Sequence, residues 1–132
     1  MEKDKNLLGN KRIEDAIAEM YKNLTEEKLA KVLYVLRDRA KEGGHLVVAI
    51  KPGDSNRFDL RTITTPDGKK WFAAFTSFDE ELKKKENIVS GFTAEITGLF
   101  DTVLNSDEIT GLIINPWDKA LKLTKAHIEL IK

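Results

Sequence analysis

The chain has 132 residues, of which 41% are hydrophobic and 33% charged, and its 22 Lys and Arg residues balance 22 Asp and Glu residues. These values are typical of a soluble globular domain with a buried core, and a net charge of zero argues against a nucleic-acid-binding protein, whose phosphate contacts need a basic excess. Cysteine is absent from the sequence, which excludes thiol catalysis, thiolate metal sites and disulfides.

The N-terminal residues predict the location of the protein. Residues 1–10 are polar and charged, and we expect them to form a flexible leader before a single domain at 11–132. They lack the apolar core of a signal peptide, and no uncharged apolar run approaches the ~20 residues of a membrane span. We therefore expect a cytoplasmic protein without a membrane partner.

Two amphipathic helices are predicted next. The first has apolar residues three and four positions apart, at Ile13, Ala16, Ile17 and Met20. The second begins at Thr25, a favourable N-cap, and ends at Gly43-Gly44. Tyr34 and Val35 lie beside its inner stripe. They either widen the core contact, which we favour, or face a partner.

The middle of the chain has the character of strands. His45 to Lys51 is apolar on both faces, which is typical of an interior strand. Phe58 to Thr65 alternates between apolar and polar residues, as a half-exposed strand does. The segment Thr65-Pro66-Asp67-Gly68-Lys69 predicts a hairpin turn, because proline presets φ and glycine takes the left-handed position. Trp71 to Thr76 is then the partner strand.

A helix is predicted after that strand. Ser77 and Glu80 form a capping box for a helix that ends at about Lys85. Ile88 and Val89 predict a brief strand. Thr93 is expected to cap a further helix, whose inner face includes Ile96, Leu99, Phe100, Val103 and Leu104.

The C-terminal part predicts a second buried strand at Leu112 to Ile114. Asn115-Pro116-Trp117-Asp118 turns the chain into Ala120 to Leu123, and Thr124 caps a terminal helix. The whole pattern predicts an α+β fold: a mixed, largely antiparallel sheet with an N-terminal helical pair and further helices packed on it.

Few residues suggest chemistry. His45 and His127 are the only histidines, and no carboxylate at helical spacing completes a metal site with either. Asp79, Glu80 and Glu81 are explained by the first turn of a capped helix, where the helix dipole favours anions. We therefore expect no catalytic residue, no metal and no cofactor, and an enzyme is disfavoured.

Three segments resemble the SseB protein N-terminal domain family. They are His45-Leu46-Val47-Val48-Ala49, Phe72-Ala73-Ala74-Phe75-Thr76-Ser77 and Gly111-Leu112-Ile113-Ile114-Asn115-Pro116-Trp117. The resemblance extends from about Ile13 to Ile131. The family takes its name from an enhanced-serine-sensitivity phenotype in enteric bacteria, so the resemblance implies a bacterial protein. It brings no catalytic residues to carry over.

The resulting functional hypothesis is a non-enzymatic protein-interaction or regulatory module with an unknown protein partner. The expected partner-binding residues are Phe78, Asp79, Glu81, Asn115 and Trp117. Tryptophan is enriched at binding hot spots, but Trp117 folding back over the adjacent hairpin is the alternative, which we favour. The alternative function is a small-molecule sensor or enzyme connected with amino-acid (serine) metabolism. A homodimer with Tyr34 and Val35 in its seam is the third hypothesis.

Overall fold

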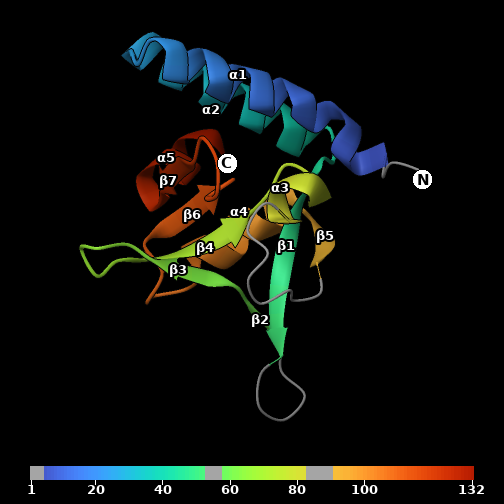
Figure 1. The fold of residues 1–132 in the computed structure, drawn as a ribbon, viewed down its shortest axis with the longest axis vertical. Helices are drawn as coiled ribbons and strands as arrows, with labels where there is room; N and C mark the ends of the chain where they lie inside the picture. Colours follow the sequence, from blue (N-terminus) through green and yellow to red (C-terminus); the bar gives the residue numbers. More distant parts are fainter. Residues whose placement is uncertain (1–4, 53–57, 83–90) are drawn as a thin grey trace.

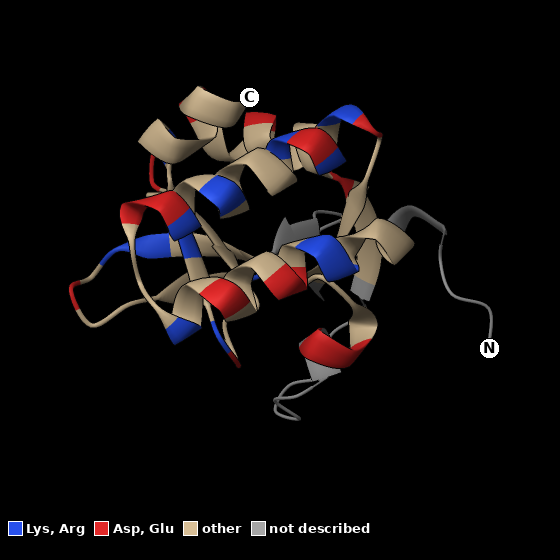
Figure 2. Cartoon of the chain, turned by 90° about the horizontal axis from the view of Figure 1, so that it is seen from above, with Lys and Arg blue, Asp and Glu red and all other residues tan. Residues whose placement is uncertain are grey.

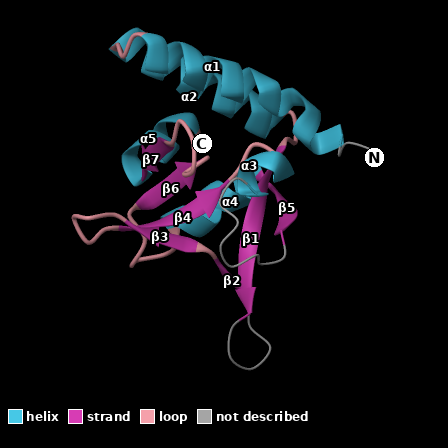
Figure 3. Cartoon of the chain, in the orientation of Figure 1, coloured by secondary structure: helices cyan, strands magenta, loops and turns pink. Residues whose placement is uncertain are grey.

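The computed structural model describes residues 5–52, 58–82 and 91–132. A 3₁₀ helix, η1 (Lys5–Asn10), leads into the antiparallel pair α1 (Lys11–Lys22) and α2 (Glu26–Lys41), which runs above the strands along the top of Figures 1 and 3. Thr25 caps α2 as predicted, because its Oγ1 accepts a hydrogen bond of 3.1 Å from the Lys28 backbone N–H. The predicted helical pair is therefore confirmed.

The strand β1 (His45–Pro52) is the centre of one sheet. It pairs antiparallel with β2 (Phe58–Leu60) on one side and β5 (Gly91–Glu95) on the other. Leu46, Val47 and Val48 are completely buried, so both faces of β1 are covered. This confirms the prediction of an interior strand from its continuous apolar run.

A second sheet has the order β3 (Thr62–Thr64), β4 (Lys70–Ala74), β6 (Gly111–Ile114) and β7 (Leu121–Thr124). Strands β4 and β6 are parallel, with Trp71 opposite Gly111, whereas β3–β4 and β6–β7 are antiparallel. The parallel pair makes the sheet mixed, and the fold is α+β with largely antiparallel pairing, as predicted.

The two sheets are joined at two points. The backbone N–H of Arg61 donates to Ala49 O in β1 at 2.9 Å, and Arg61 O accepts from Ala73 N in β4 at 3.0 Å. At the other end, Val47 and Phe75 exchange two backbone hydrogen bonds of 2.8 Å. The predicted strand from Phe58 to Thr65 is therefore divided at Arg61, where its pairing partner changes from β1 to β4.

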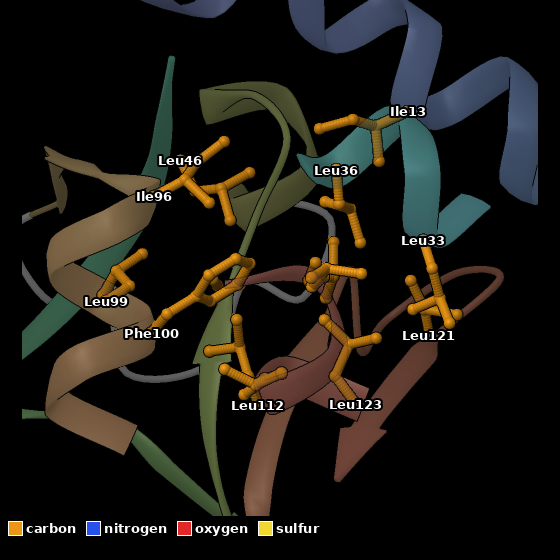
Figure 4. Close-up of a cluster of buried hydrophobic side chains, with 14 of the residues drawn as sticks. Ile13, Leu33, Leu36, Leu46, Ile96, Leu99, Phe100, Leu112, Leu121 and Leu123 are labelled. Atoms are coloured by element: carbon orange, nitrogen blue, oxygen red, sulfur yellow. The ribbon is translucent and has the colours of Figure 1, made fainter. Parts of the chain in front are cut away.

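The main hydrophobic core lies between the helices and one face of the strands (Figure 4). The helices α4 (Ile96–Leu104) and α5 (Lys125–Ile131) contribute Phe100 and Ile128, and α2 contributes Leu36. A smaller cluster on the opposite face of the β4–β6 pair contains Trp71, Phe75 and other apolar residues. Both faces of the parallel pair are therefore apolar, which for β6 agrees with the predicted buried strand at Leu112 to Ile114.

The N-cap at Thr93 was wrongly predicted. Thr93 belongs to β5, opposite Val47 in β1, and α4 begins at Ile96 with Glu95 as its N-cap. The short helix α3 (Phe78–Leu82) begins where the capping box predicts it. The predicted end of this helix near Lys85 and the predicted strand at Ile88 and Val89 lie outside the described residues.

The neighbouring residues Tyr34 and Val35 on α2 differ in burial. Val35 packs against the main core, whereas the Tyr34 side chain is 58% exposed. The favoured core interpretation therefore holds for Val35 alone. In the described part of the chain, no helix combines the length and the apolar content needed to cross a bilayer.

Residues 5–10 are the only described part of the expected leader. Within η1, Asn10 is 1% exposed and forms hydrogen bonds to distant parts of the chain. The division of the chain at residue 10 stays a prediction.

Candidate functional site

A cleft of about 410 Å³ lies between α1, the start of α3 and the turn between β6 and β7. Its position follows from the parallel pairing of β4 and β6, because both strands end at the same edge of the sheet. Ser77 and α3 follow β4 there, and Asn115 follows β6. Clefts at the carboxyl ends of parallel strands are common binding sites in α/β sheets.

The chain directions at this edge are set by local capping. Ser77 Oγ accepts a hydrogen bond of 3.2 Å from the Glu80 backbone N–H, which confirms this half of the predicted capping box. The cap fixes the first turn of α3, and so it fixes Asp79 and Glu80 in the lining of the cleft.

Asn115 shapes the opposite wall of the cleft. Its φ of 53° is left-handed, a conformation that asparagine tolerates better than most residues. Its Oδ1 accepts from the Thr76 backbone N–H at 2.9 Å, and its Nδ2 donates to Thr76 Oγ1 at 3.0 Å. The side chain is only 5% exposed. Asn115 therefore holds the two strand ends together.

Thr76 also ties the sheet to α1. Its Oγ1 donates a hydrogen bond of 2.5 Å to Glu14 Oε2, on the wall of the cleft that α1 supplies. A hydrogen bond from a hydroxyl to a charged carboxylate is stronger than one between two neutral groups. The three sides of the cleft are thus connected through one buried threonine.

Acidic side chains dominate the cleft. Among the residues that the structure describes, five carboxylate residues and one cationic residue, Lys119, line the cleft; the carboxylates are Glu14, Asp15, Asp79, Glu80 and Asp118. Figure 2 shows the acidic segments of α1 and α3 next to each other. The chain as a whole is neutral, so this surface concentrates negative charge locally.

Ile17 and Ala18 add an apolar portion to the lining. No group of three or more Asp, Glu or His side chains that could hold a metal ion is present among residues 5–52, 58–82 and 91–132. The arrangement suits an extended cation with an apolar stem better than a compact metal ion, because the carboxylates are spread around the cleft.

Trp117 lies apart from the cleft lining. Its ring packs against Phe75, with 6.0 Å between ring centroids, and the Arg61 guanidinium lies 5.0 Å from the Trp117 centroid. The ring belongs to the smaller cluster on the other face of the sheet. It therefore folds back over the sheet, as the favoured interpretation of the sequence expects.

The expected partner-binding residues are thus divided. Asp79 and Asn115 meet in the cleft, Trp117 packs on the other face, and the Phe78 side chain is 40% exposed at the start of α3. The side chain of Glu81 lies outside the described residues. A partner-binding role stays a prediction for all five.

Four charged residues of the cleft were not predicted from the sequence: Glu14, Asp15, Asp118 and Lys119. Glu14 and Asp15 look like ordinary surface residues of a helix, and nothing local places α1 over the end of β4. The left-handed φ of 51° at Lys119 also has no signal in the residue type. Only the helical spacing, which puts Glu14, Ile17 and Ala18 on one face, hinted at a shared surface.

Comparison with known proteins gives one finding. Residues 7–130 match the family model described as SseB protein N-terminal domain, which covers nearly the whole chain. No curated protein and no solved structure matches the chain.

Proposed function

The chain belongs to the family of the SseB protein N-terminal domain, and on that premise we propose that it is a non-enzymatic protein-interaction module. The cleft is its binding site, and a basic segment of a partner protein is its ligand. The proposal places the module in a bacterial cytoplasm, which fractionation of the native cells would test.

One observation carries the proposal: carboxylates from three separate parts of the chain converge on one cleft. Asp15 comes from α1, Asp79 from α3 and Asp118 from the β6–β7 turn. Grouping like charges disfavours the folded state through their mutual repulsion. A cationic partner relieves that repulsion, so the same arrangement favours the complex.

The shape of the cleft supports a lysine or arginine side chain as the ligand. Such a side chain lays its aliphatic stem on apolar surface and keeps its charged end among polar groups. Ile17 and Ala18 supply the apolar surface, and Asp79 and Asp118 line the same cleft. The binding groups are held in place before binding because Glu14 and Asn115 are both bonded to Thr76.

Labelled peptides of equal length test this function directly. A lysine- and arginine-containing fluorescein-labelled peptide, its glutamine-substituted analogue and an acidic counterpart are titrated with the protein, and fluorescence polarisation is measured. We expect binding of the basic peptide alone. The affinity should fall between 0.05 and 0.5 M NaCl, about the range over which salt screens exposed charges.

A charge-matched pair of variants provides the control. The double variant Asp79→Asn/Asp118→Asn removes two charges from the cleft, and Asp107→Asn/Glu108→Gln removes two exposed charges before β6, at the other end of that strand. We expect about a tenfold or greater loss of affinity for the first and little change for the second. Equal losses in both, or equal binding of the neutral peptide, would contradict the proposal.

A small-molecule sensor connected with amino-acid metabolism is the second candidate. The cleft volume of about 410 Å³ lies within the range of ligand pockets. Lys119 beside the carboxylates also offers both charges that a zwitterionic amino acid needs. A thermal-shift screen with free amino acids tests it, because a ligand at 100 times its Kd adds about 2.7 kcal/mol. The absence of any shift would count against this candidate.

A further inference from the structure

The last residue of η1, Asn10, is bonded to three separate parts of the fold. Its Nδ2 donates to His45 O at 2.7 Å and to Thr76 O at 3.0 Å. Its Oδ1 accepts from Arg39 Nε at 3.1 Å. The amide is thereby satisfied while it is 1% exposed, so an N-terminal turn is bonded to the start of β1, the end of β4 and the end of α2.

Thr76 relays this attachment to the cleft. Its carbonyl accepts from Asn10, its N–H donates to Asn115, and its hydroxyl donates to Glu14. Asn115 and Glu14 line the cleft on two sides. The Asn10 amide is therefore separated from each cleft wall by a single residue, Thr76, which is itself 1% exposed.

The turn is also fitted closely against Arg39. A Cβ atom built on Gly9 would lie 2.6 Å from Arg39 Nη1, and one on Gly44 would lie 2.7 Å from Arg39 Cζ. The guanidinium thus lies against glycine backbone from η1 and from the segment before β1. Leu7 of the same turn packs on the smaller cluster, which also contains Trp117.

We propose that η1 is a latch for the cleft. When Asn10 is undocked, Thr76 loses its partner on one side, and the segments that carry Glu14, Asn115 and the start of α3 loosen together. Hydrogen bonds within a 3₁₀ helix have poorer geometry than those of an α-helix, so loss of the Asn10 contacts lets this six-residue turn open locally without global unfolding. For its biological consequence, a lower affinity for a partner, this inference rests on the proposed function.

Hydrogen exchange followed by mass spectrometry tests the latch without any partner. The variant Asn10→Asp keeps an acceptor for Arg39 but replaces the two N–H donors with a carboxylate oxygen. The variant Asn10→Ala removes the acceptor and the donors together. We expect about tenfold faster exchange in residues 75–82 and 113–120, as the loss of buried hydrogen bonds implies. Exchange in residues 28–36 and 97–104, which do not contact Asn10, should stay as in the unsubstituted protein.

Leu8→Ala is the matched control, since Leu8 lies in the same turn and is exposed. Faster exchange confined to residues 5–12 in both Asn10 variants would overturn the latch. Global unfolding of both variants would overturn it equally, because the turn could then not open with the fold intact.

The latch and the proposed function fail in different experiments. Asp79→Asn leaves every hydrogen bond of Asn10 and Thr76 in place, so it should weaken binding of the basic peptide without changing exchange. If the two Asn10 variants show the expected faster exchange but Asp79→Asn binds the basic peptide as tightly as before, the proposed ligand is wrong. The proposal that η1 is a latch then still stands.

Discussion

Thr76 and Asn115 are 39 positions apart in the chain, yet the side chain of Asn115 is bonded to both the backbone N–H and the hydroxyl of Thr76. This contact holds together the two strand ends between which the cleft opens. The Asn115 N–H also donates to Ala74 O at 2.9 Å, which continues the parallel ladder by one residue.

Substitution of Asn115 should separate its two roles. Asn115→Ala leaves the buried Thr76 N–H without its acceptor, at a cost of about 1–3 kcal/mol. It also puts alanine in a left-handed conformation, which adds about 1–2 kcal/mol. Asn115→Gly loses only the hydrogen bonds, so urea unfolding should find it more stable than Asn115→Ala. Equal stability would mean that backbone strain at φ 53° is unimportant.

Two glycines give opposite expectations for the same substitution. A Cβ atom on Gly111 would lie 1.9 Å from the carbonyl oxygen of Leu123, so Gly111→Ala should prevent the pairing of β6 with β7. Gly98 in α4 has nothing within 4 Å of its Cβ position, and Gly98→Ala should stabilise the protein by about 0.4–1 kcal/mol. Thermal unfolding of both variants checks this, and a folded, stable Gly111→Ala variant would contradict the register.

Glu42 links stability to pH. Its hydrogen bond with Arg12 holds the pKa of this carboxyl below its ordinary value of 4.5. Because the pKa is lower in the folded state, the contribution is present above pH 4.5 and is lost as the pH falls through the folded-state value. Glu42→Gln should therefore reduce stability at pH 7 but make no difference at the acid end. Urea unfolding of both proteins from pH 7 to pH 2 measures this, and a constant difference would exclude the pair as its cause.

Trp117 and Phe78 should respond differently to truncation. Trp117→Ala removes a ring that packs on Phe75 and lies beside Arg61, so we expect a loss of about 1–3 kcal/mol in stability. Phe78→Ala truncates a side chain that is 40% exposed, and a change within about 0.5–1 kcal/mol is expected. Chemical unfolding measures both, and the reverse order would require Trp117 to face outward.

Tyr34 provides the test of the homodimer hypothesis. Val35 packs on the core, so of this pair only Tyr34 presents a largely exposed side chain. If a dimer seam includes it, light scattering should give a mass that rises with concentration, and Tyr34→Ser should abolish the rise. A constant monomer mass up to millimolar protein would rule the seam out.

Local chemistry determined which parts of the fold were predictable. The N-caps at Thr25, Ser77 and Thr124 depend on residues within three positions, and all three accept the expected backbone hydrogen bond. Thr93 is also a good capping residue, but pairing with β1 outweighed that local preference. Where a residue suits two local roles, its contacts with distant parts of the chain determine which role it adopts.

The candidate site was harder to predict than the fold, for the same reason. Asp79 and Asn115 follow recognisable strands, so their position at a strand end could be inferred. Glu14 reaches the cleft only because α1 lies over the end of β4, and its bond to Thr76 spans 62 positions of sequence. No pattern in a single sequence specifies such a contact.

The pairing of the chain on either side of Arg61 with different sheets has a consequence for how the protein unfolds. Arg61 pairs with Ala49 in one sheet and with Ala73 in the other, and Val47 pairs with Phe75. Neither sheet can therefore unfold without breaking hydrogen bonds to the other. The strands before and after residue 61 are therefore not separable fragments, and we expect heat or denaturant to unfold both sheets in one transition.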